Sequence, residues 1–100
     1  MSIYKILFLS KAQNELIDAW LWYEKRQVGL GDKFKKEVFN CINKIALNPA
    51  AYPLRNELFR ERKINIFPYL IIYNYSLEYD VILITSIFHT SRNPKNKYSD

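Results

Sequence analysis

The residues of this chain that could perform acid–base chemistry are few. The one histidine, His89, could act as a general acid or base, but a lone histidine is also often a structural residue. The one cysteine, Cys41, cannot form an intramolecular disulfide, and one cysteine with one histidine cannot build a structural zinc site. The sequence therefore excludes disulfide-stapled and zinc-dependent modules, implies no cofactor and leaves the role of His89 open.

Cations are concentrated in the segment FRERK, residues 59–63. On an extended strand Arg60 and Arg62 share one face, while Lys63 lies on the other. The arginine pair could hold a phosphate group, or it could pair with the carboxylates of an acidic protein. Charge of this kind also keeps an edge strand soluble. A further arginine, Arg92, lies in the polar segment at the end of the chain.

A strand and a helix are predicted at the N-terminal end. Residues 3–9 (IYKILFL) are apolar and β-prone, as expected for a buried strand. Ser10 and Gln13 then match a capping box, which predicts a helix over about residues 11–27. The apolar residues on one face of this helix are Ala12, Leu16, Ala19, Trp20 and Tyr23.

A second helix is predicted after a short loop. Gly29 and Gly31 permit the chain to reverse, and Asp32 is expected to cap the helix. Pro49 ends the helix, because proline forces the preceding residue away from helical ψ. Its buried stripe would carry Phe34, Val38, Cys41, Ile42 and Ile45. Because the loop is short, the two helices should form an antiparallel hairpin.

Three strands are predicted after the helices, over residues 58–67, 69–75 and 80–89. The order β-α-α-β-β-β with short connections predicts an α+β fold, in which the helix hairpin packs on a small, mainly antiparallel sheet. The three tyrosines of segment 69–75 could stack nucleic-acid bases, although packing against the helices accounts for them better.

The composition indicates one small basic domain over residues 1–100, with a polar tail at residues 91–100. The 100 residues carry a net charge of +5 and are 49% hydrophobic, which argues against disorder. The charge suits nucleic acid or an acidic protein and identifies neither. No apolar stretch approaches the ~20 residues that span a bilayer. The N-terminal segment does not resemble a signal peptide, so a cytoplasmic location is expected.

Several local patterns occur in an order that resembles a known family. Gly29-x-Gly31-x-x-Phe34 opens the second helix, Phe67-Pro68-Tyr69 precedes a tyrosine-terminated strand, and His89-x-x-Arg92-x-Pro94 follows the last strand. Over about residues 3–95 the chain resembles the RelE/ParE superfamily of toxins from bacterial type II toxin–antitoxin modules, and the ParE branch most closely.

The resemblance implies two helices on an antiparallel sheet that the N-terminal strand completes. It also implies a hetero-oligomeric complex with a cognate antitoxin, which we expect to be encoded by the adjacent gene and to be acidic in its toxin-binding half. Leu21 lies opposite the apolar face of the first helix, Ile17 lies partly on that side and Trp22 lies at its margin. These three residues are candidate antitoxin contacts, unless the helix is buried on more than one side or they are ordinary surface apolar residues.

The resemblance further implies one of two activities: ParE-like members poison DNA gyrase, whereas RelE-like members cleave mRNA on the ribosome. Nuclease members usually carry an arginine where this chain has Leu70, and often a tyrosine or another catalytic group where it has Thr90. Losing a transition-state cation typically costs about 10²–10³ in rate. Gyrase inhibition is therefore the primary hypothesis.

Two alternatives stay open. The first is a metal-independent, ribosome-dependent endoribonuclease that would use His89, Arg62 and Arg92, with its acid, base and cation supplied by side chains. The second is an inactive toxin-like protein that only binds an antitoxin. Arg60 and Lys63 are candidate contacts to the target or to nucleic acid.

Overall fold

The computed structural model describes residues 4–98 as one α+β unit, which confirms the predicted fold class. Ile3, the first residue of the predicted N-terminal strand, and residues 99–100 of the tail lie outside the described residues. The elements are β1 (Lys5–Phe8), α1 (Ser10–Arg26), α2 (Leu30–Leu47), β2 (Leu54–Asn56), β3 (Phe59–Lys63), β4 (Tyr69–Ser76) and β5 (Val81–His89), with short 3-10 helices η1 (Pro49–Ala51) and η2 (Pro94–Asn96).

The strands form one mixed five-stranded sheet in the order β1-β5-β4-β3-β2. β1 pairs with β5 in parallel, and the other neighbours are antiparallel. The single strand predicted over residues 58–67 is wrong in its bounds, because β3 ends at Lys63 and Ile66 adopts a φ of 74° in the turn before β4. β2 was not predicted: its three residues are all exposed and so carry no apolar alternation.

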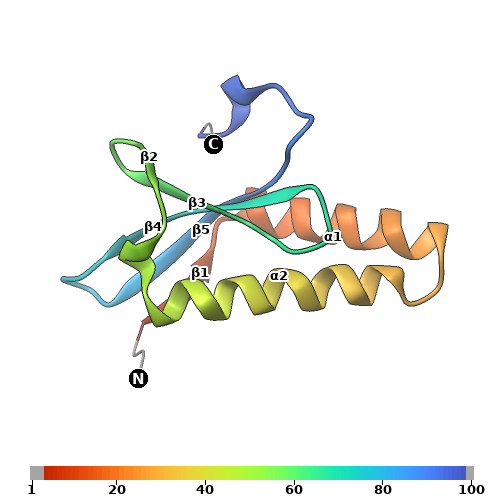
Figure 1. Ribbon diagram of the computed structural model, residues 1–100, viewed down its shortest axis with the longest axis horizontal. Coiled ribbons are helices and arrows are strands. Elements are labelled where there is room, and N and C mark those ends of the chain that lie inside the picture. Colours follow the sequence, from red (N-terminus) through yellow and green to blue (C-terminus); the bar gives the residue numbers. More distant parts are fainter. Residues whose placement is uncertain (1–3, 99–100) are drawn as a thin grey trace.

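The sheet separates two unlike layers (Figure 1). The antiparallel helix hairpin packs on one face, which we call the inner face, and the chain after β5 crosses the other, outer face. The inner-face core includes Phe34, Val38, Ile42 and Ile45 from α2 and Ile71, Tyr73, Ile84 and Ile87 from the sheet. Tyr73 is fully buried and its hydroxyl donates to the Pro49 carbonyl at 2.6 Å, which confirms core packing for this tyrosine.

The predicted helix caps are both wrong. α1 begins at Ser10 itself, so Leu9 is the N-cap residue and no side chain caps it. α2 begins at Leu30, before Asp32, whose carboxylate instead accepts a hydrogen bond from Trp20 Nε1 at 3.0 Å. The cap of α2 comes from α1, because the Glu24 carboxylate accepts the backbone N–H groups of Gly29 and Gly31, both at 2.9 Å.

Both glycines of the hairpin loop are required by its geometry. Gly29 has a φ of 90°, a left-handed conformation that other residues adopt only with strain. Gly31 lies so close to α1 that a Cβ there would stand 2.5 Å from the Trp20 carbonyl oxygen. The loop therefore brings the two helices together at the distance that Glu24 needs to cap α2.

No helix within residues 4–98 is both long enough and apolar enough to cross a membrane.

Candidate functional site

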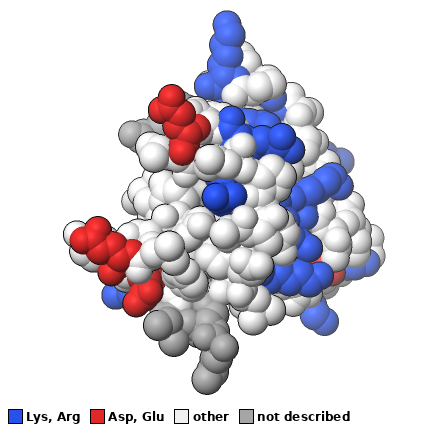
Figure 2. All heavy atoms as spheres, turned by 60° about the vertical axis from the view of Figure 1, so that its left-hand side comes forward, with Lys and Arg blue, Asp and Glu red and all other residues white. Residues whose placement is uncertain are grey.

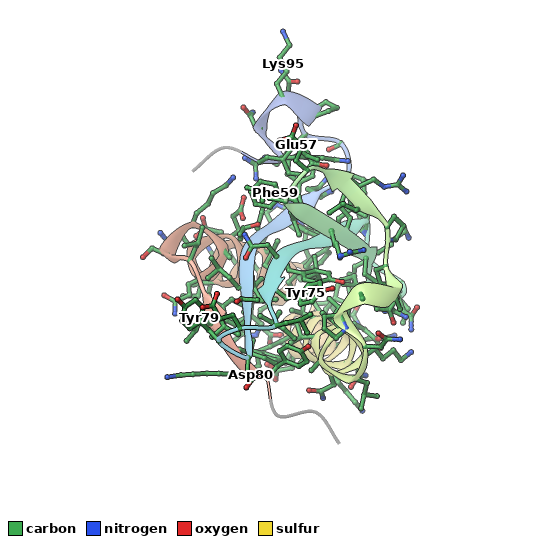
Figure 3. The ribbon with its side chains drawn as sticks, turned by 90° about the vertical axis from the view of Figure 1, so that its left-hand side faces the viewer. Glu57, Phe59, Tyr75, Tyr79, Asp80 and Lys95 are labelled. Carbon is green, nitrogen blue, oxygen red and sulfur yellow. The ribbon has the colours of Figure 1, made fainter. Side chains whose placement is uncertain are left out.

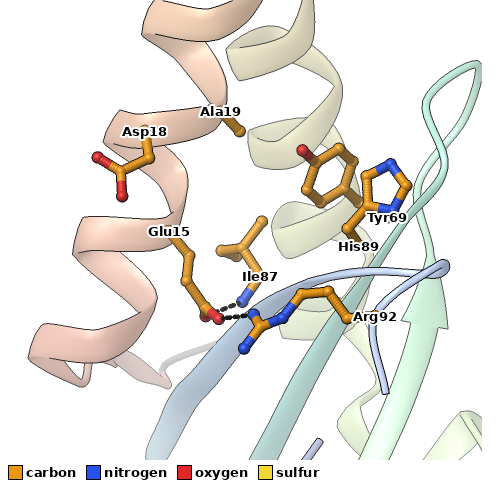
Figure 4. Close-up of a pocket in the computed structure, with 7 residues that line it drawn as sticks. All are labelled: Glu15, Asp18, Ala19, Tyr69, Ile87, His89 and Arg92. Atoms are coloured by element: carbon orange, nitrogen blue, oxygen red, sulfur yellow. Dashed lines mark hydrogen bonds and ion pairs between the residues drawn. The ribbon is translucent and has the colours of Figure 1, made fainter. Parts of the chain in front are cut away.

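A pocket of about 260 Å³ lies where α1 meets the ends of β4 and β5 (Figure 4). Glu15, Asp18 and Ala19 line it from α1, Tyr69 from β4, Ile87 and His89 from β5, and Arg92 from the segment that follows. The sequence patterns Phe67-Pro68-Tyr69 and His89-x-x-Arg92 thus meet in one place, from elements that are adjacent only in the folded sheet.

Glu15 is the residue that holds this pocket together. β1 pairs with β5 only as far as Ile84, so the edge of β5 beyond it has no strand partner. Glu15 Oε1 accepts the Ile87 backbone N–H at 3.0 Å and the Ser86 hydroxyl at 2.8 Å, and Oε2 forms an ion pair with Arg92. A carboxylate thereby replaces the missing strand and fixes the start of the C-terminal segment.

Sequence reasoning did not identify Glu15, since its partners lie more than 70 positions away: 71 for Ser86 and 77 for Arg92. A glutamate on the polar part of an amphipathic helix gives no local signal of such a role.

His89 is held by the turn that follows it. Its Nδ1 accepts the Ser91 backbone N–H at 3.0 Å and lies 2.7 Å from the Ser91 hydroxyl. Because Nδ1 is an acceptor, the neutral ring carries its proton on Nε2. The ring also packs edge-on against Tyr69, with 4.9 Å between centroids. His89 therefore has both a structural role and a free ring nitrogen, and the geometry allows either interpretation of this residue.

Tyr69 belongs to an aromatic cluster at the junction of the hairpin and the sheet. Its ring contacts Phe34 at 4.9 Å and Tyr23 at 6.4 Å, and Phe67 contacts Phe34 and Tyr23 at 5.2 and 4.9 Å. Burial raises the pKa of Tyr69 to about 12, and the electrostatic interaction and hydrogen bond with Tyr23 act in the same direction. The phenol is thus protonated well above neutral pH, and its one donor hydrogen is engaged with Tyr23.

The structure separates Arg62 from the other two candidate nuclease residues. His89 and Arg92 line the pocket, whereas the Arg62 side chain turns toward α2, donates to Cys41 Sγ at 3.4 Å and lies 5.1 Å from the Tyr52 ring. The hydrogen bond to Cys41 raises the pKa of Arg62, and burial raises the pKa of the Cys41 thiol. Arg62 therefore connects β3 to α2.

Arg60 has a similar structural contact. Its guanidinium donates to the carbonyls of Ala50 and Tyr52 at 3.3 and 2.7 Å, and it lies 5.5 Å from the Tyr75 ring. Arg60 and Arg62 thus share the inner face of β3, as the strand alternation predicted, while Lys63 is exposed. β2 covers the edge of β3 only at Phe59 and Arg60, so Arg60 does not lie on an open edge of the sheet.

The pocket has few groups for phosphate chemistry. Its one arginine is paired with Glu15, and Asp18 adds a second carboxylate. Leu70, in the position where a nuclease would have arginine, is half-buried on β4 in register with Lys63 and Phe88. Within residues 4–98 no group of three or more His, Cys, Asp or Glu residues could hold a metal ion.

A second concave surface lies along the helix hairpin. An apolar groove of about 370 Å³ is lined by Phe8, Gln13, Leu16, Ile17 and Phe39. Ile17, Leu21 and Trp22 are 49%, 43% and 52% exposed, and Arg26 covers the Trp22 ring at 4.2 Å. The structure therefore leaves all three candidate antitoxin contacts accessible, with Ile17 in the groove itself.

The end of the molecule opposite the α1–α2 loop carries its charges unevenly. Figure 2 shows Lys and Arg side chains mainly on one side of this end, Asp and Glu on the other, and a mostly uncharged surface between them. A pocket of about 320 Å³ at this end is lined by Leu54, Glu57, Leu58, Arg60, Tyr75 and Leu77.

The chain matches known proteins in its sequence family and in its fold. Residues 6–94 match the family described as the ParE toxin of the type II toxin–antitoxin system, parDE. A solved structure from the chromosomal ParDE toxin–antitoxin system of P. aeruginosa superposes with a TM-score of 0.75, at 13% sequence identity, over 89% of this chain and 98% of that chain. At this identity the likeness concerns the fold. The search of curated protein sequences gives no significant match.

Proposed function

The chain belongs to the ParE toxin family of type II toxin–antitoxin systems, and we propose that it inhibits DNA gyrase in the cytoplasm by binding rather than by catalysis. The observation that carries the proposal is the family match, which extends over residues 6–94. The site geometry supports it, because Arg62 lies away from His89, Arg92 is paired with Glu15, and position 70 has no cation.

The toxin component of such a module has an antitoxin as partner, and we place the antitoxin contact on α1. Ile17, Leu21 and Trp22 are exposed on a helix whose other side is packed, and the groove beside Ile17 is apolar. Exposed apolar side chains of this size on a small protein are typical of a protein–protein interface. The net charge of +5 favours an acidic antitoxin segment.

A supercoiling assay with purified gyrase and relaxed plasmid tests the target. The toxin should inhibit supercoiling and trap a gyrase–DNA cleavage complex, and prior mixing with the product of the adjacent gene should abolish both effects. The variant Leu21→Ala/Trp22→Ala provides the matched control, because it should still inhibit gyrase while the antitoxin no longer protects. Folded toxin that leaves gyrase unaffected at high concentration would disprove the gyrase target.

Expression of the toxin in cells distinguishes the alternatives. Primer extension on cellular mRNA after induction should give no new 5′ ends; new ends that vanish in His89→Ala would instead favour an endoribonuclease, since His89 and Arg92 do share a pocket. Unchanged growth on induction, together with a stable complex with the antitoxin, would indicate an inactive toxin-like protein.

A further inference from the structure

Residues 90–98, which we call the C-terminal strap, lie across the outer face of the sheet (Figure 1). The strap folds around η2, where Asn93 Oδ1 accepts the Lys95 N–H at 3.0 Å. Its sequence, TSRNPKNKY, contains three basic residues, no acidic residue and no large aliphatic side chain. Figure 3 shows Lys95 projecting from the strap away from the sheet, with Phe59 on the sheet side. The strap is therefore attached by polar and aromatic groups.

Glu61 is the main attachment point beneath the strap. Its side chain is 9% exposed, and Lys97 Nζ lies 3.2 Å from Oε2, which also accepts a hydrogen bond from the Tyr98 hydroxyl. The Tyr98 ring stacks on Phe59, with 5.1 Å between centroids and 21° between planes. A basic side chain and the aromatic residue after it thus satisfy one buried carboxylate together.

An apolar strip continues beside Glu61. Ile72 lies opposite Glu61 in the β3–β4 register, and Phe88 on β5 follows on the same face. Both are buried, at 0% and 1% exposed, although neither belongs to the inner-face core. The cations of Arg92 and Lys97 lie 5.0 and 6.0 Å from the Phe88 ring. Two basic side chains of the strap therefore lie over the Phe88 ring, and one of them, Lys97, also pairs with Glu61.

We infer that the C-terminal strap is a releasable cover, and that the strip formed by Phe59, Glu61, Ile72 and Phe88 binds a target-protein segment in which a basic residue precedes an aromatic one. The strap shows which ligand chemistry the strip accepts, because Lys97 and Tyr98 occupy it as an intramolecular ligand. The inference rests on the proposed function, since it assigns this surface to contact with the target.

The energetics permit such an exchange. Lys97 is 24% and Glu61 9% exposed, and both charged groups regain water when the strap opens, which offsets most of the free energy of the lost ion pair. A tethered segment competes at an effective concentration on the order of millimolar. A segment of a target protein already docked elsewhere on the toxin has a similar advantage, so it can replace the strap without an unusually strong local affinity.

The first experiment prevents the strap from opening. Lys11 Nζ donates to the Asn96 carbonyl at 3.2 Å, so the pair Lys11→Cys and Asn96→Cys can be joined by a reducible bismaleimide without changing the strip. Cys41 is 2% exposed and should not react, and each single variant is the control. The joined chain should lose at least about tenfold in gyrase inhibition and recover it on reduction. Equal inhibition by the joined and reduced forms would overturn the inference.

The second experiment tests the strip without gyrase. The full-length variant Lys97→Ala/Tyr98→Ala should bind a peptide of residues 90–98, while wild type should not. Adding Glu61→Gln should weaken this binding by about tenfold, the effect of a lost charged hydrogen bond. No peptide binding by the folded double variant, or binding that Glu61→Gln leaves unchanged, would overturn the inference. If wild type without the crosslink does not inhibit gyrase, the proposed function fails. The peptide experiment then tests by itself whether the strip binds a basic–aromatic segment.

Discussion

The two faces of the sheet are covered in physically different ways. On the inner face, two helices of 17 and 18 residues bury aliphatic and aromatic side chains against the strands. On the outer face, a short basic segment is attached through Glu15, Glu61 and two aromatic rings. Burial of a large apolar side chain contributes about 1.5–3 kcal/mol, whereas a partly exposed ion pair contributes about 0–1 kcal/mol.

The two layers therefore suit different roles: the helix layer stabilises the domain, and the strap layer suits recognition of a partner. The helix layer can open only with the whole domain, because its side chains interdigitate with those of the sheet. The strap layer can open locally, since few of its contacts depend on the rest of the core. A small toxin can thus combine a rigid scaffold with a locally opening surface within 100 residues.

The largest effect is expected for a truncation on the inner face. Phe34 is fully buried and contacts Tyr23, Phe67 and Tyr69, so Phe34→Ala should lower the free energy of unfolding by about 3–5 kcal/mol. Urea denaturation monitored by circular dichroism measures it. The outer-face counterpart, Phe59→Ala, should cost clearly less; equal losses would remove the distinction between the two faces.

A second inner-face change tests how closely the helices approach. Gly31→Ala places a methyl group 2.5 Å from the Trp20 carbonyl oxygen, a backbone atom that cannot move alone. We expect a loss of about 1–3 kcal/mol in the same denaturation experiment. Unchanged stability would show that the hairpin adapts and that the helix layer is looser than described.

Glu15 on α1 contacts both β5 and Arg92 of the strap, so its substitution affects both layers. Glu15→Ala leaves the Ile87 N–H without its acceptor and releases Arg92, so we expect a loss of about 1–3 kcal/mol. Glu15→Gln retains a carbonyl acceptor and should recover part of this loss. If the two variants are equally unstable, the ion pair with Arg92 and not the hydrogen bond at the edge of β5 carries the effect.

The smallest effect concerns the strap at high pH. Burial and the hydrogen bond to Glu61 raise the pKa of Tyr98 from 10.0 to about 12. A raised pKa means that the stabilisation is complete below pH 10 and is lost as the pH rises through about 12. The phenolate would then face Glu61, with Lys97 and Arg55 as nearby cations.

Tyr69 and Tyr73 also have raised pKa values, so absorbance titration of the tyrosines should show several late phenols in wild type and one fewer in Tyr98→Phe. Below pH 10, Tyr98→Phe should cost less than about 1 kcal/mol. A Tyr98 that titrates with the exposed tyrosines would contradict the attachment of the strap to Glu61.

The sequence predicts the parts of this fold that depend on local pattern. Both helices appear within a few residues of their expected bounds, because their apolar stripes have a helical period. The cap of α2 was mispredicted because α2 takes its cap from Glu24 on the preceding helix. β2 was missed because a short, exposed edge strand has no apolar alternation.

The site was less predictable, because its contacts form between elements that are far apart in the sequence. His89 and Arg92 could be proposed from their residue types, and the folded sheet brings them together. That Glu15 neutralises Arg92, and that Arg62 turns toward α2, depend on which elements become neighbours. The tail was predicted to be polar, but only the register of β3 places Glu61 where Lys97 and Tyr98 can reach it.

Native-state hydrogen exchange of the full chain tests the difference between the two faces most directly. The strap amides of Asn96 and Lys97 are hydrogen-bonded to Asn93 and Pro94, so each has a measurable protection. We predict that these amides exchange through local opening, at a free energy well below that of the amides of Ile42 and Ile45 in α2. Strap amides that exchange only with global unfolding would contradict the account.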